Sequence, residues 1–191
     1  MDALTDFGDS AVVLPLACVI LAWMFFAEGW RPAALWGGAV FLCAAVTALL
    51  KLYFGACTVV DAAIHSPSGH SSMSALVYGG LAVIIALELR GWWRNMAVIL
   101  GIGLAIAIGL SRIVLRVHTE LEVLIGLAAG FAVLIAFVPI YLRVKPRHVR
   151  HWPLDVAAAF TIFVLHGQVL AIEPILQRLA AILGRTIGLC A

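Results

Sequence analysis

Six apolar segments follow one another along this chain, and each approaches the length that a helix needs to cross a membrane. A spanning helix contributes about 20 apolar residues to the hydrocarbon layer. The predicted spans are residues 11–27, 33–54, 69–89, 95–115, 119–142 and 153–172. Only 12% of the residues are charged, whereas about a quarter of a soluble domain is charged. The sequence therefore predicts an all-α integral membrane protein, folded as a six-helix bundle.

The segment after the sixth span has apolar residues on one side and polar residues on the other. Its apolar positions are Ile175, Leu176, Leu179, Ile182 and Leu183, and its polar positions include Gln177, Arg178 and Arg185. Apolar residues at this spacing line one face of a helix. We therefore expect residues 173–188 to form an amphipathic C-terminal helix at the membrane surface. The length of 191 residues fits a single domain over the whole chain, 1–191.

Lysine and arginine residues are distributed unequally between the two ends of the predicted bundle. Six spans place both termini on one side of the membrane. The loops after the first, third and fifth spans contain seven Lys and Arg residues, and the other side contains five. Cytoplasmic loops carry the excess of positive charge, so we expect both termini to face away from the cytoplasm. The small net charge of +2 gives no reason to expect a nucleic-acid partner.

Glycines recur within the fourth and fifth spans. The glycines are Gly101, Gly103, Gly109, Gly126 and Gly130. Helices approach closely where such small residues lie, so we expect these positions to be packing surfaces.

Three histidines lie in the last part of the chain, outside the two polar clusters considered below. We expect His148 and His151, in a basic loop, to contact lipid headgroups. We expect His166, with Gln168 near it, to make a buried polar contact within the sixth span.

A short polar segment, Ser66-Pro67-Ser68-Gly69-His70, precedes the third span. Small residues at a helix start expose backbone N–H groups, and the helix dipole adds partial positive charge there. Such a helix start can bind an anion. The alternative interpretation is an N-cap turn followed by a surface histidine.

A second polar cluster lies at the junction of the fourth and fifth spans, on the same predicted side. His118 and Glu122 are four residues apart and so share one face of a helix. The carboxylate can then accept the Nδ1 proton of His118 and leave Nε2 available to attack. The alternative is an ordinary polar pair at a helix start. Arg112 and Lys51 place charges near membrane depth, which is costly and usually functional, unless they reach out to headgroups.

No residues with metal-ligand spacing occur on this predicted side of the chain. It has no His-x-x-x-His or Asp-x-Asp pair, and the four cysteines have no such spacing either. Two or three cations, together with helix N–H groups, can take the place of a metal at a phosphoryl group. We therefore expect a site that uses neither a metal nor another cofactor.

Together these residues resemble the type 2 phosphatidic acid phosphatase superfamily of membrane enzymes, called PAP2. Its second motif is Pro-Ser-Gly-His, and residues 67–70 match it in full. Its third motif is Ser-Arg, then a His six residues after the Arg and an Asp four residues after the His. Ser111, Arg112 and His118 match that motif in identity and spacing, and Glu122 stands where the family usually has Asp.

The first motif of the family, a Lys followed seven residues later by Arg-Pro, is incomplete here. Lys51 matches its start, but Thr58 and Val59 occupy the Arg-Pro positions. One phosphate-binding cation is therefore missing, and His65 and Arg116 are the candidates to replace it. The resemblance covers about residues 51–130.

The resemblance implies a catalytic role for each matching residue. His118 is the implied nucleophile, which forms a phosphohistidine and is oriented by Glu122. His70 is implied to protonate the leaving oxygen and later to activate water. The residues implied to hold the phosphoryl oxygens are Lys51, Ser68, Gly69 and Arg112.

Three functions are compatible with these motifs. The first is a metal-independent phosphatase that acts on a lipid phosphate or an isoprenyl diphosphate, at the outer face of a bacterial inner membrane. The second is a degenerate family member that binds a lipid phosphate or a partner without turnover; the incomplete first motif favours it and the intact histidines oppose it. The third is an activity like that of the vanadate-dependent haloperoxidases, which share the motifs.

Overall fold

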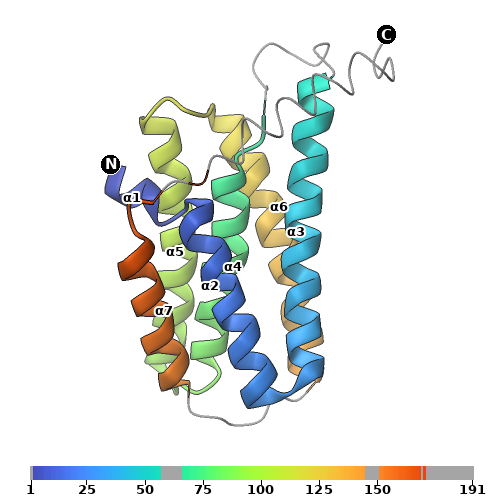
Figure 1. The fold of residues 1–191 in the computed structure, drawn as a ribbon, viewed down its shortest axis with the longest axis vertical. Coiled ribbons are helices and arrows are strands. Elements are labelled where there is room, and N and C mark those ends of the chain that lie inside the picture. The colour runs from blue at the N-terminus through green and yellow to red at the C-terminus, as the bar shows by residue number, and fades with distance from the viewer. Residues whose placement is uncertain (1, 57–65, 145–150, 169, 171–191) are drawn as a thin grey trace.

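The computed structural model describes residues 2–56, 66–144, 151–168 and 170, and every regular element among them is a helix. In chain order these are α1 (Asp2–Asp6), α2 (Ser10–Trp23), the π-helix η1 (Met24–Glu28), α3 (Trp30–Ala56), α4 (Gly69–Ala86), α5 (Trp92–Val114), α6 (Glu120–Arg143) and α7 (Trp152–Leu165). The long helices run side by side in one bundle (Figure 1).

Five stretches of the described chain are long and apolar enough to cross a membrane. They are Ala3–Glu28, Trp30–Gly55, Gly69–Ala86, Trp92–Val114 and Glu120–Arg143. With α7 they make up a six-helix bundle, so the predicted all-α membrane fold is confirmed, and the protein is a multi-pass membrane protein. The amphipathic helix predicted over residues 173–188 lies outside the described residues.

The sixth helix is shorter than the sequence suggested. α7 has 14 residues and ends at Leu165, so it extends about 21 Å, against roughly 30 Å of hydrocarbon. Gly167 has a φ of +83°, which glycine adopts readily and which commonly ends a helix. His166 therefore lies at the end of α7, where its Nε2 is 2.9 Å from the Ala3 carbonyl oxygen. The predictions of a span to residue 172, and of His166 within it, were wrong. They gave the apolar run more weight than Gly167, which ends the helix.

α4 occupies the centre of the bundle (Figure 1). In its apolar window 72% of the residues are buried, against 22–39% in the other four membrane stretches. It is also the least apolar of the five, because a helix surrounded by protein need not be compatible with lipid. Ser71, Ser72 and Ser74 are all buried along it. The other helices are thus assembled on α4.

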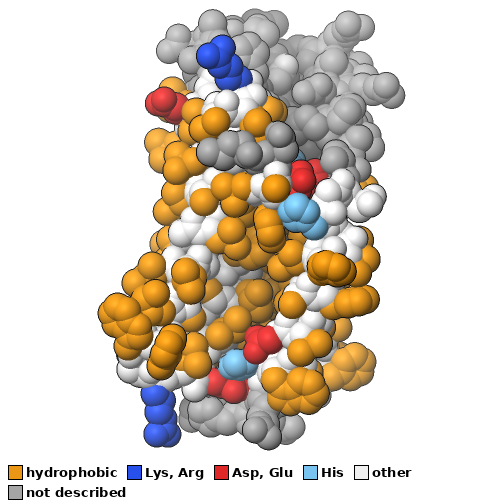
Figure 2. Space-filling view, turned by 90° about the vertical axis from the view of Figure 1, so that its left-hand side faces the viewer, with side chains coloured by type: hydrophobic (Ala, Val, Ile, Leu, Met, Phe, Trp, Pro, Cys, Tyr) orange, Lys and Arg blue, Asp and Glu red, His pale blue; other side chains and the backbone are white. Residues whose placement is uncertain are grey.

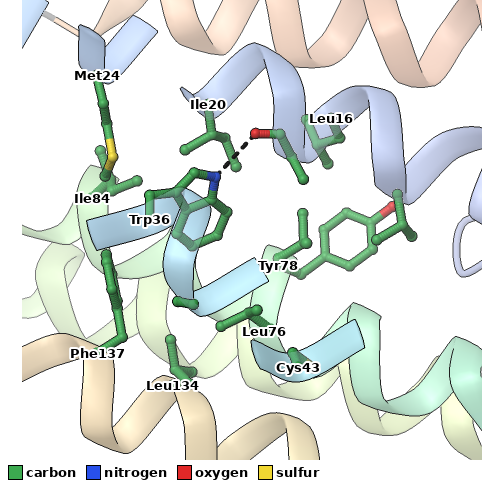
Figure 3. Close-up of a cluster of buried hydrophobic side chains, with 14 of the residues drawn as sticks. Leu16, Ile20, Met24, Trp36, Cys43, Leu76, Tyr78, Ile84, Leu134 and Phe137 are labelled. Carbon is green, nitrogen blue, oxygen red and sulfur yellow. Dashed lines mark hydrogen bonds between the residues drawn. The ribbon is translucent and has the colours of Figure 1, made fainter. Parts of the chain in front are cut away.

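The core away from the site is built around Trp36 of α3. Its indole N–H donates to the Ala17 carbonyl oxygen over 3.0 Å, and its ring packs edge-on against Phe137, with 5.4 Å between centroids (Figure 3). Gly80 of α4 leaves room for the indole, because a Cβ there would overlap the ring. Such aromatic pairs contribute about 0.5–1.5 kcal/mol beyond their buried area. This cluster joins α2, α3, α4 and α6.

α4 and α6 approach each other closely along a line of glycines. A Cβ on Gly126 would overlap the Ser68 carbonyl oxygen, and a Cβ on Gly130 would overlap the Ser72 carbonyl oxygen. Each pair is spaced four residues apart on its own helix, so the contact repeats at every turn. The predicted packing role of these two glycines is confirmed. This seam, defined by Gly126 and Gly130 against Ser68 and Ser72, leads directly to the site.

α5 packs against α4 through a single glycine of its first half. A Cβ on Gly101 would overlap the Ala82 side chain and would lie 2.8 Å from the Tyr78 carbonyl oxygen. Gly103 has no atom within 4 Å of the same position. The predicted packing role of Gly103 was therefore wrong, because residues two positions apart on a helix lie on different faces.

The outer faces of the helices are apolar. Phe26 and Phe163 are 84% and 83% exposed. Figure 2 shows a broad band of apolar side chains between charged groups that gather near the two ends. Exposed apolar surface on this scale is the mark of a membrane-facing protein.

At the end of the bundle away from the site, His151 lies between two carboxylates. Its Nδ1 is 2.8 Å from Asp155 Oδ2, and its Nε2 is 3.5 Å from Glu88 Oε2. These contacts tie the start of α7 to the segment between α4 and α5. The prediction that His151 contacts headgroups was wrong, because no local pattern links it to Glu88. His148 lies outside the described residues.

Candidate active site

The site lies at the end of the bundle where α4 and α6 begin and α5 ends, and this end also carries α1 (Figure 1). The two polar clusters predicted from the sequence meet there. The Ser68 N–H donates to the Glu122 backbone carbonyl oxygen over 3.0 Å. The Ser66 N–H donates to the Glu122 carboxylate over 2.8 Å. The segment before α4 is thus fastened to the first turn of α6.

The Glu122 carboxylate is buried and holds three groups. Its Oε2 is 2.9 Å from Nδ1 of His118 and accepts the Thr119 N–H over 3.1 Å. Its Oε1 accepts the Ser66 N–H. A buried carboxylate has to be paired in this way. With the Nδ1 proton held by Glu122, a neutral His118 presents its lone pair on Nε2.

Glu122 is also part of the cap of α6. The Thr119 hydroxyl accepts the Glu122 N–H over 3.3 Å while the Glu122 carboxylate accepts the Thr119 N–H, which makes a reciprocal capping box. The Thr-x-x-Glu spacing signals this cap in the sequence, although the predicted role of Glu122 was limited to His118. One carboxylate therefore fixes both the start of α6 and the orientation of the histidine.

A tight turn carries the chain from α5 to His118. Arg116 has a φ of +57°; its N–H donates to the Ile113 carbonyl and the Val117 N–H donates to the Arg112 carbonyl. This is the Schellman motif, which usually has Gly in the left-handed position; another residue there costs about 1–2 kcal/mol. The His118 N–H also donates to the Arg112 carbonyl over 3.3 Å. The turn thus fixes the spacing between Arg112 and His118.

The first turn of α4 presents two backbone N–H groups. Ser68 is the N-cap, and its hydroxyl accepts from the Ser71 N–H over 3.4 Å and from the Ser71 hydroxyl over 2.9 Å. The N–H groups of Gly69 and His70 belong to the first turn, so the helix itself offers them no carbonyl. A helix start with two such N–H groups can bind an anion. Ser68 is fully buried, and its hydroxyl serves here as the cap.

Lys51 lies beside this helix start. It is 6% exposed, and its Nζ lies 3.9 Å from the position that a Cβ would take on Gly69. Thr47, one turn earlier on α3, has its hydroxyl 2.9 Å from the Ser72 hydroxyl, which holds α3 against α4. The ammonium group therefore adds its positive charge at the first turn of α4, where the sequence predicted a phosphate site.

Two residues of the N-terminal segment contact the remaining predicted groups. Arg112 Nη1 donates to the Thr5 hydroxyl over 3.2 Å. His70 Nε2 is 3.4 Å from Asp9 Oδ2, and the ring lies within electrostatic reach of Arg112 and His118. Neither Thr5 nor Asp9 was predicted, because contacts between residues so far apart in the chain leave no local pattern. The only sequence signal at Asp9 is that of an N-cap before an apolar run.

A pocket of about 400 Å³ opens beside His118. It is lined by Ile113, Arg116, Val117, His118, Thr119 and Glu122. Arg116, a candidate to replace the missing cation, is therefore next to the predicted nucleophile. Thr58, Val59 and His65 lie outside the described residues.

The fold and the site define a class of protein: a helical membrane bundle with two histidines and two basic side chains gathered at one end. Lys51, Arg112 and the first turn of α4 can hold a tetrahedral anion, and His118 can attack it. In the part of the chain that the structure describes, no three His, Cys, Asp or Glu residues are grouped so as to hold a metal ion.

The chain belongs to the PAP2 superfamily, whose sequence model matches residues 57–146. Phosphatidylglycerophosphatase B of Bacillus subtilis is 30% identical over 143 residues, which cover 68% of each chain. An uncharacterized 22.5 kDa protein in the cps region of Klebsiella pneumoniae is 31% identical over 133 residues. That match covers 66% of this chain but only 62% of the relative. No solved structure gives a significant match.

Proposed function

We propose that this protein is a PAP2-type phosphatase that removes a phosphoryl group from a membrane lipid through a phosphohistidine on His118. The observation that carries the proposal is the 2.9 Å contact between His118 Nδ1 and the Glu122 carboxylate, because it leaves Nε2 to act as the nucleophile. Membership of the PAP2 superfamily supports a phosphate substrate. The name of the Bacillus relative, a phosphatidylglycerophosphatase, supports a lipid phosphate in particular.

The proposed reaction has two steps. In the first, His118 Nε2 attacks phosphorus, and the P–N bond forms while the bond to the lipid oxygen breaks and His70 gives that oxygen a proton. In the second, His70 takes a proton from a water molecule that attacks phosphorus, the P–N bond breaks and phosphate leaves. Lys51, Arg112 and the N–H groups of Gly69 and His70 balance the charge on the phosphoryl oxygens.

The proposed site works without a metal ion. Lys51 and Arg112 supply two full charges and the first turn of α4 supplies a partial one, while Arg116 lies close enough to the pocket to supply another. We therefore expect EDTA to leave activity intact and vanadate, which mimics five-coordinate phosphorus, to inhibit it. Activity that disappears in EDTA and returns with Mg²⁺ would show that this part of the proposal is wrong.

Binding of a lipid phosphate without turnover is the second candidate function. Thr58 and Val59 in place of Arg-Pro favour it, because one expected cation is absent from the first motif. A panel of lipid monophosphates and isoprenyl diphosphates given to purified protein distinguishes the two functions. Release of phosphate from any of them supports the phosphatase, and binding without release from all of them supports the second function.

The two histidines should fail differently when replaced. His118→Ala should abolish turnover of every substrate, because the nucleophile is lost. His70→Ala should lower the rate on lipid substrates by roughly 10²–10⁴-fold, the usual value of general acid help to a poor leaving group. p-Nitrophenolate departs without such help. The His70→Ala protein should therefore release a burst of p-nitrophenol from p-nitrophenyl phosphate and then turn over slowly, with phosphate held on His118.

Rapid-quench kinetics with labelled substrate measure both effects, since phosphohistidine is labile to acid and stable to base. His151→Ala removes a histidine at the opposite end of the bundle and should retain the wild-type pattern. Equal losses for both leaving groups in His70→Ala, with no trapped phosphate, would mean that these roles are misassigned.

A further inference from the structure

The N-terminal segment before α2 runs along α4 in register with its turns. His70, Ser74 and Tyr78 are four residues apart and therefore share one side of α4. The Tyr78 hydroxyl donates to the Phe7 carbonyl oxygen over 2.7 Å. At the next turn Gly8 packs so closely that a Cβ would lie 3.1 Å from Ser74 Oγ. The segment is thus fixed at two successive turns on the side of α4 that carries His70.

Asp9 continues this register at the turn that holds His70. Its Oδ2 is 3.4 Å from His70 Nε2. Its Oδ1 accepts the Ala11 N–H over 2.8 Å and the Leu170 N–H over 3.0 Å. Asp9 is only 6% exposed, so this carboxylate faces its three protein partners instead of solvent. Its position relative to the His70 ring is therefore set by the fold.

The positive charges around His70 indicate what the Asp9 carboxylate contributes to the site. Arg112, on α5, and His118, in the turn after it, both lie within electrostatic reach of the ring. Arg112 is needed there for the phosphoryl group, so its positive charge cannot be moved away. A carboxylate beside the ring balances that charge in the surroundings where His70 has to hold a proton.

We propose that Asp9 is a positioning residue for His70, a role that rests on the proposed phosphatase function. Asp9 holds one ring nitrogen and stabilises the protonated ring, and the other nitrogen gives its proton to the lipid oxygen as the bond to phosphorus breaks. The neutral ring stays against Asp9 and takes a proton from the attacking water. The site then contains two carboxylate–histidine pairs: Glu122 prepares His118 as the nucleophile, and Asp9 prepares His70 as the acid.

Asp9→Asn tests this role, with Asp6→Asn as the matched control. Asparagine is as good an N-cap as aspartate and can still accept the Ala11 N–H, so the variant removes the charge and keeps the start of α2. Asp6→Asn removes the same charge from the same segment, but the carboxylate that contacts His70 belongs to Asp9. The measurements are the single-turnover rate on a lipid phosphate, the burst rate from p-nitrophenyl phosphate, and thermal unfolding in detergent.

We expect Asp9→Asn to lower the lipid rate by about 10–100-fold, a part of the general acid contribution, and to leave the p-nitrophenol burst within about two-fold of wild type. Asp6→Asn should match wild type in both. Equal losses for both leaving groups, or no loss for either, would overturn the role of Asp9 while leaving the phosphatase intact. Wild-type protein that turns over no lipid phosphate would overturn the proposed function and this role with it.

Discussion

Glu122 is one methylene longer than the aspartate usual at this position in the family, and its contacts use that length. One oxygen reaches the Ser66 N–H while the other reaches both His118 and Thr119. A capping box needs Glu or Gln at the third helical position, because the side chain must reach back to the N-cap. The longer residue therefore couples the proposed nucleophile to the start of α6 and to the segment before α4.

Glu122→Gln should lower the rate of phosphoenzyme formation by roughly 10²–10⁴-fold, in the range that follows when a carboxylate behind a catalytic histidine becomes an amide. The amide keeps the size of the side chain but offers only one oxygen to N–H donors and carries no charge. Rapid-quench labelling measures the rate. Glu120→Gln, an exposed acid in the same helical turn, is the matched control and should retain the wild-type rate.

Glu122→Asp separates charge from length. It keeps the carboxylate but shortens its reach, so we expect more phosphoenzyme formation than in Glu122→Gln together with a loss of cap stability of about 0.5–2 kcal/mol. Thermal unfolding in detergent measures that loss. A Gln variant as fast as wild type, or an Asp variant slower than Gln, would contradict the coupling described here.

Contacts within one turn of helix could be predicted from the sequence, and contacts across the chain could not. The His118–Glu122 pair follows from a spacing of four residues, and its 2.9 Å contact confirms it. The Asp9–His70 and Thr5–Arg112 contacts join parts of the chain whose distance depends on how all the helices pack. Only the assembled bundle brings these residues together.

At the scale of elements, the site depends on how closely α6 lies against α4. Glu122, Gly126 and Gly130 follow each other at intervals of four residues on one side of α6. The two glycines fit against the carbonyl oxygens of Ser68 and Ser72. One turn earlier on α6, Glu122 accepts the N–H groups of Ser66 and Ser68. The glycine seam therefore sets the distance between the anion-binding helix start and the proposed nucleophile.

Gly130→Ala should destabilise the protein by about 1–3 kcal/mol, the usual cost of overpacking a tight contact. The added Cβ would overlap the Ser72 carbonyl oxygen and come within 2.8 Å of the Ala75 Cβ, and neither atom belongs to a flexible side chain. Because α6 has to move, phosphatase activity should fall as well. Thermal unfolding in detergent and an activity assay measure the two effects.

Gly103→Ala is the control for this prediction, since nothing lies within 4 Å of its added Cβ. It should keep full activity and gain up to about 1 kcal/mol from the better helix propensity of alanine. Two variants with the same melting temperature would mean that the α4–α6 seam is not as tight as described.

The sequence predicted that helices form and roughly where, but not which surfaces meet. Apolar length and small residues mark Gly101, Gly103 and Gly126 alike, yet only packing decides that Gly103 faces outward. The end of α7 was misjudged because four apolar residues, Val169 to Ile172, follow soon after His166 and resemble a continuing span, while one glycine ends the helix. Local signals compete at such points, and contacts such as that between His166 and Ala3 settle the outcome.

At the scale of the whole molecule, the two ends of the bundle differ in character. One end carries the proposed phosphate site, α1 and the last turn of α7 (Figure 1). The other end carries the His151 contacts with Glu88 and Asp155, and a hydrogen bond of 2.9 Å from the Tyr141 hydroxyl to Glu28. An apolar band lies between them (Figure 2). The orientation of the bundle in the membrane therefore decides from which side a lipid phosphate reaches His118.

We propose that the site end faces away from the cytoplasm, at the periplasmic face of a bacterial inner membrane. By the spans predicted from the sequence, seven Lys and Arg residues fall on the opposite side and five on the site side, and the cytoplasmic side carries the excess. Among the described residues, the first group contains Arg31, Arg90, Arg94 and Arg143, and the second contains Lys51, Arg112 and Arg116. Of the five, Lys51 and Arg112 belong to the proposed phosphate site, so we expect them to contribute less than their number to topology. The end of α7, where His166 contacts Ala3, therefore lies on the side where α1 begins.

Reporter fusions test this orientation. Alkaline phosphatase folds only outside the cytoplasm, so a fusion after Ala191 should be active, and a fluorescent protein at the same position should stay dark. A matched pair of fusions after Arg147, in the basic segment of sequence between α6 and α7, should give the reverse. If instead the Ala191 fusion fluoresces and the Arg147 fusion is an active phosphatase, the bundle is inverted. The positive charges around the site would then outweigh the loops in setting topology, and the lipid would have to be dephosphorylated from the cytoplasmic leaflet.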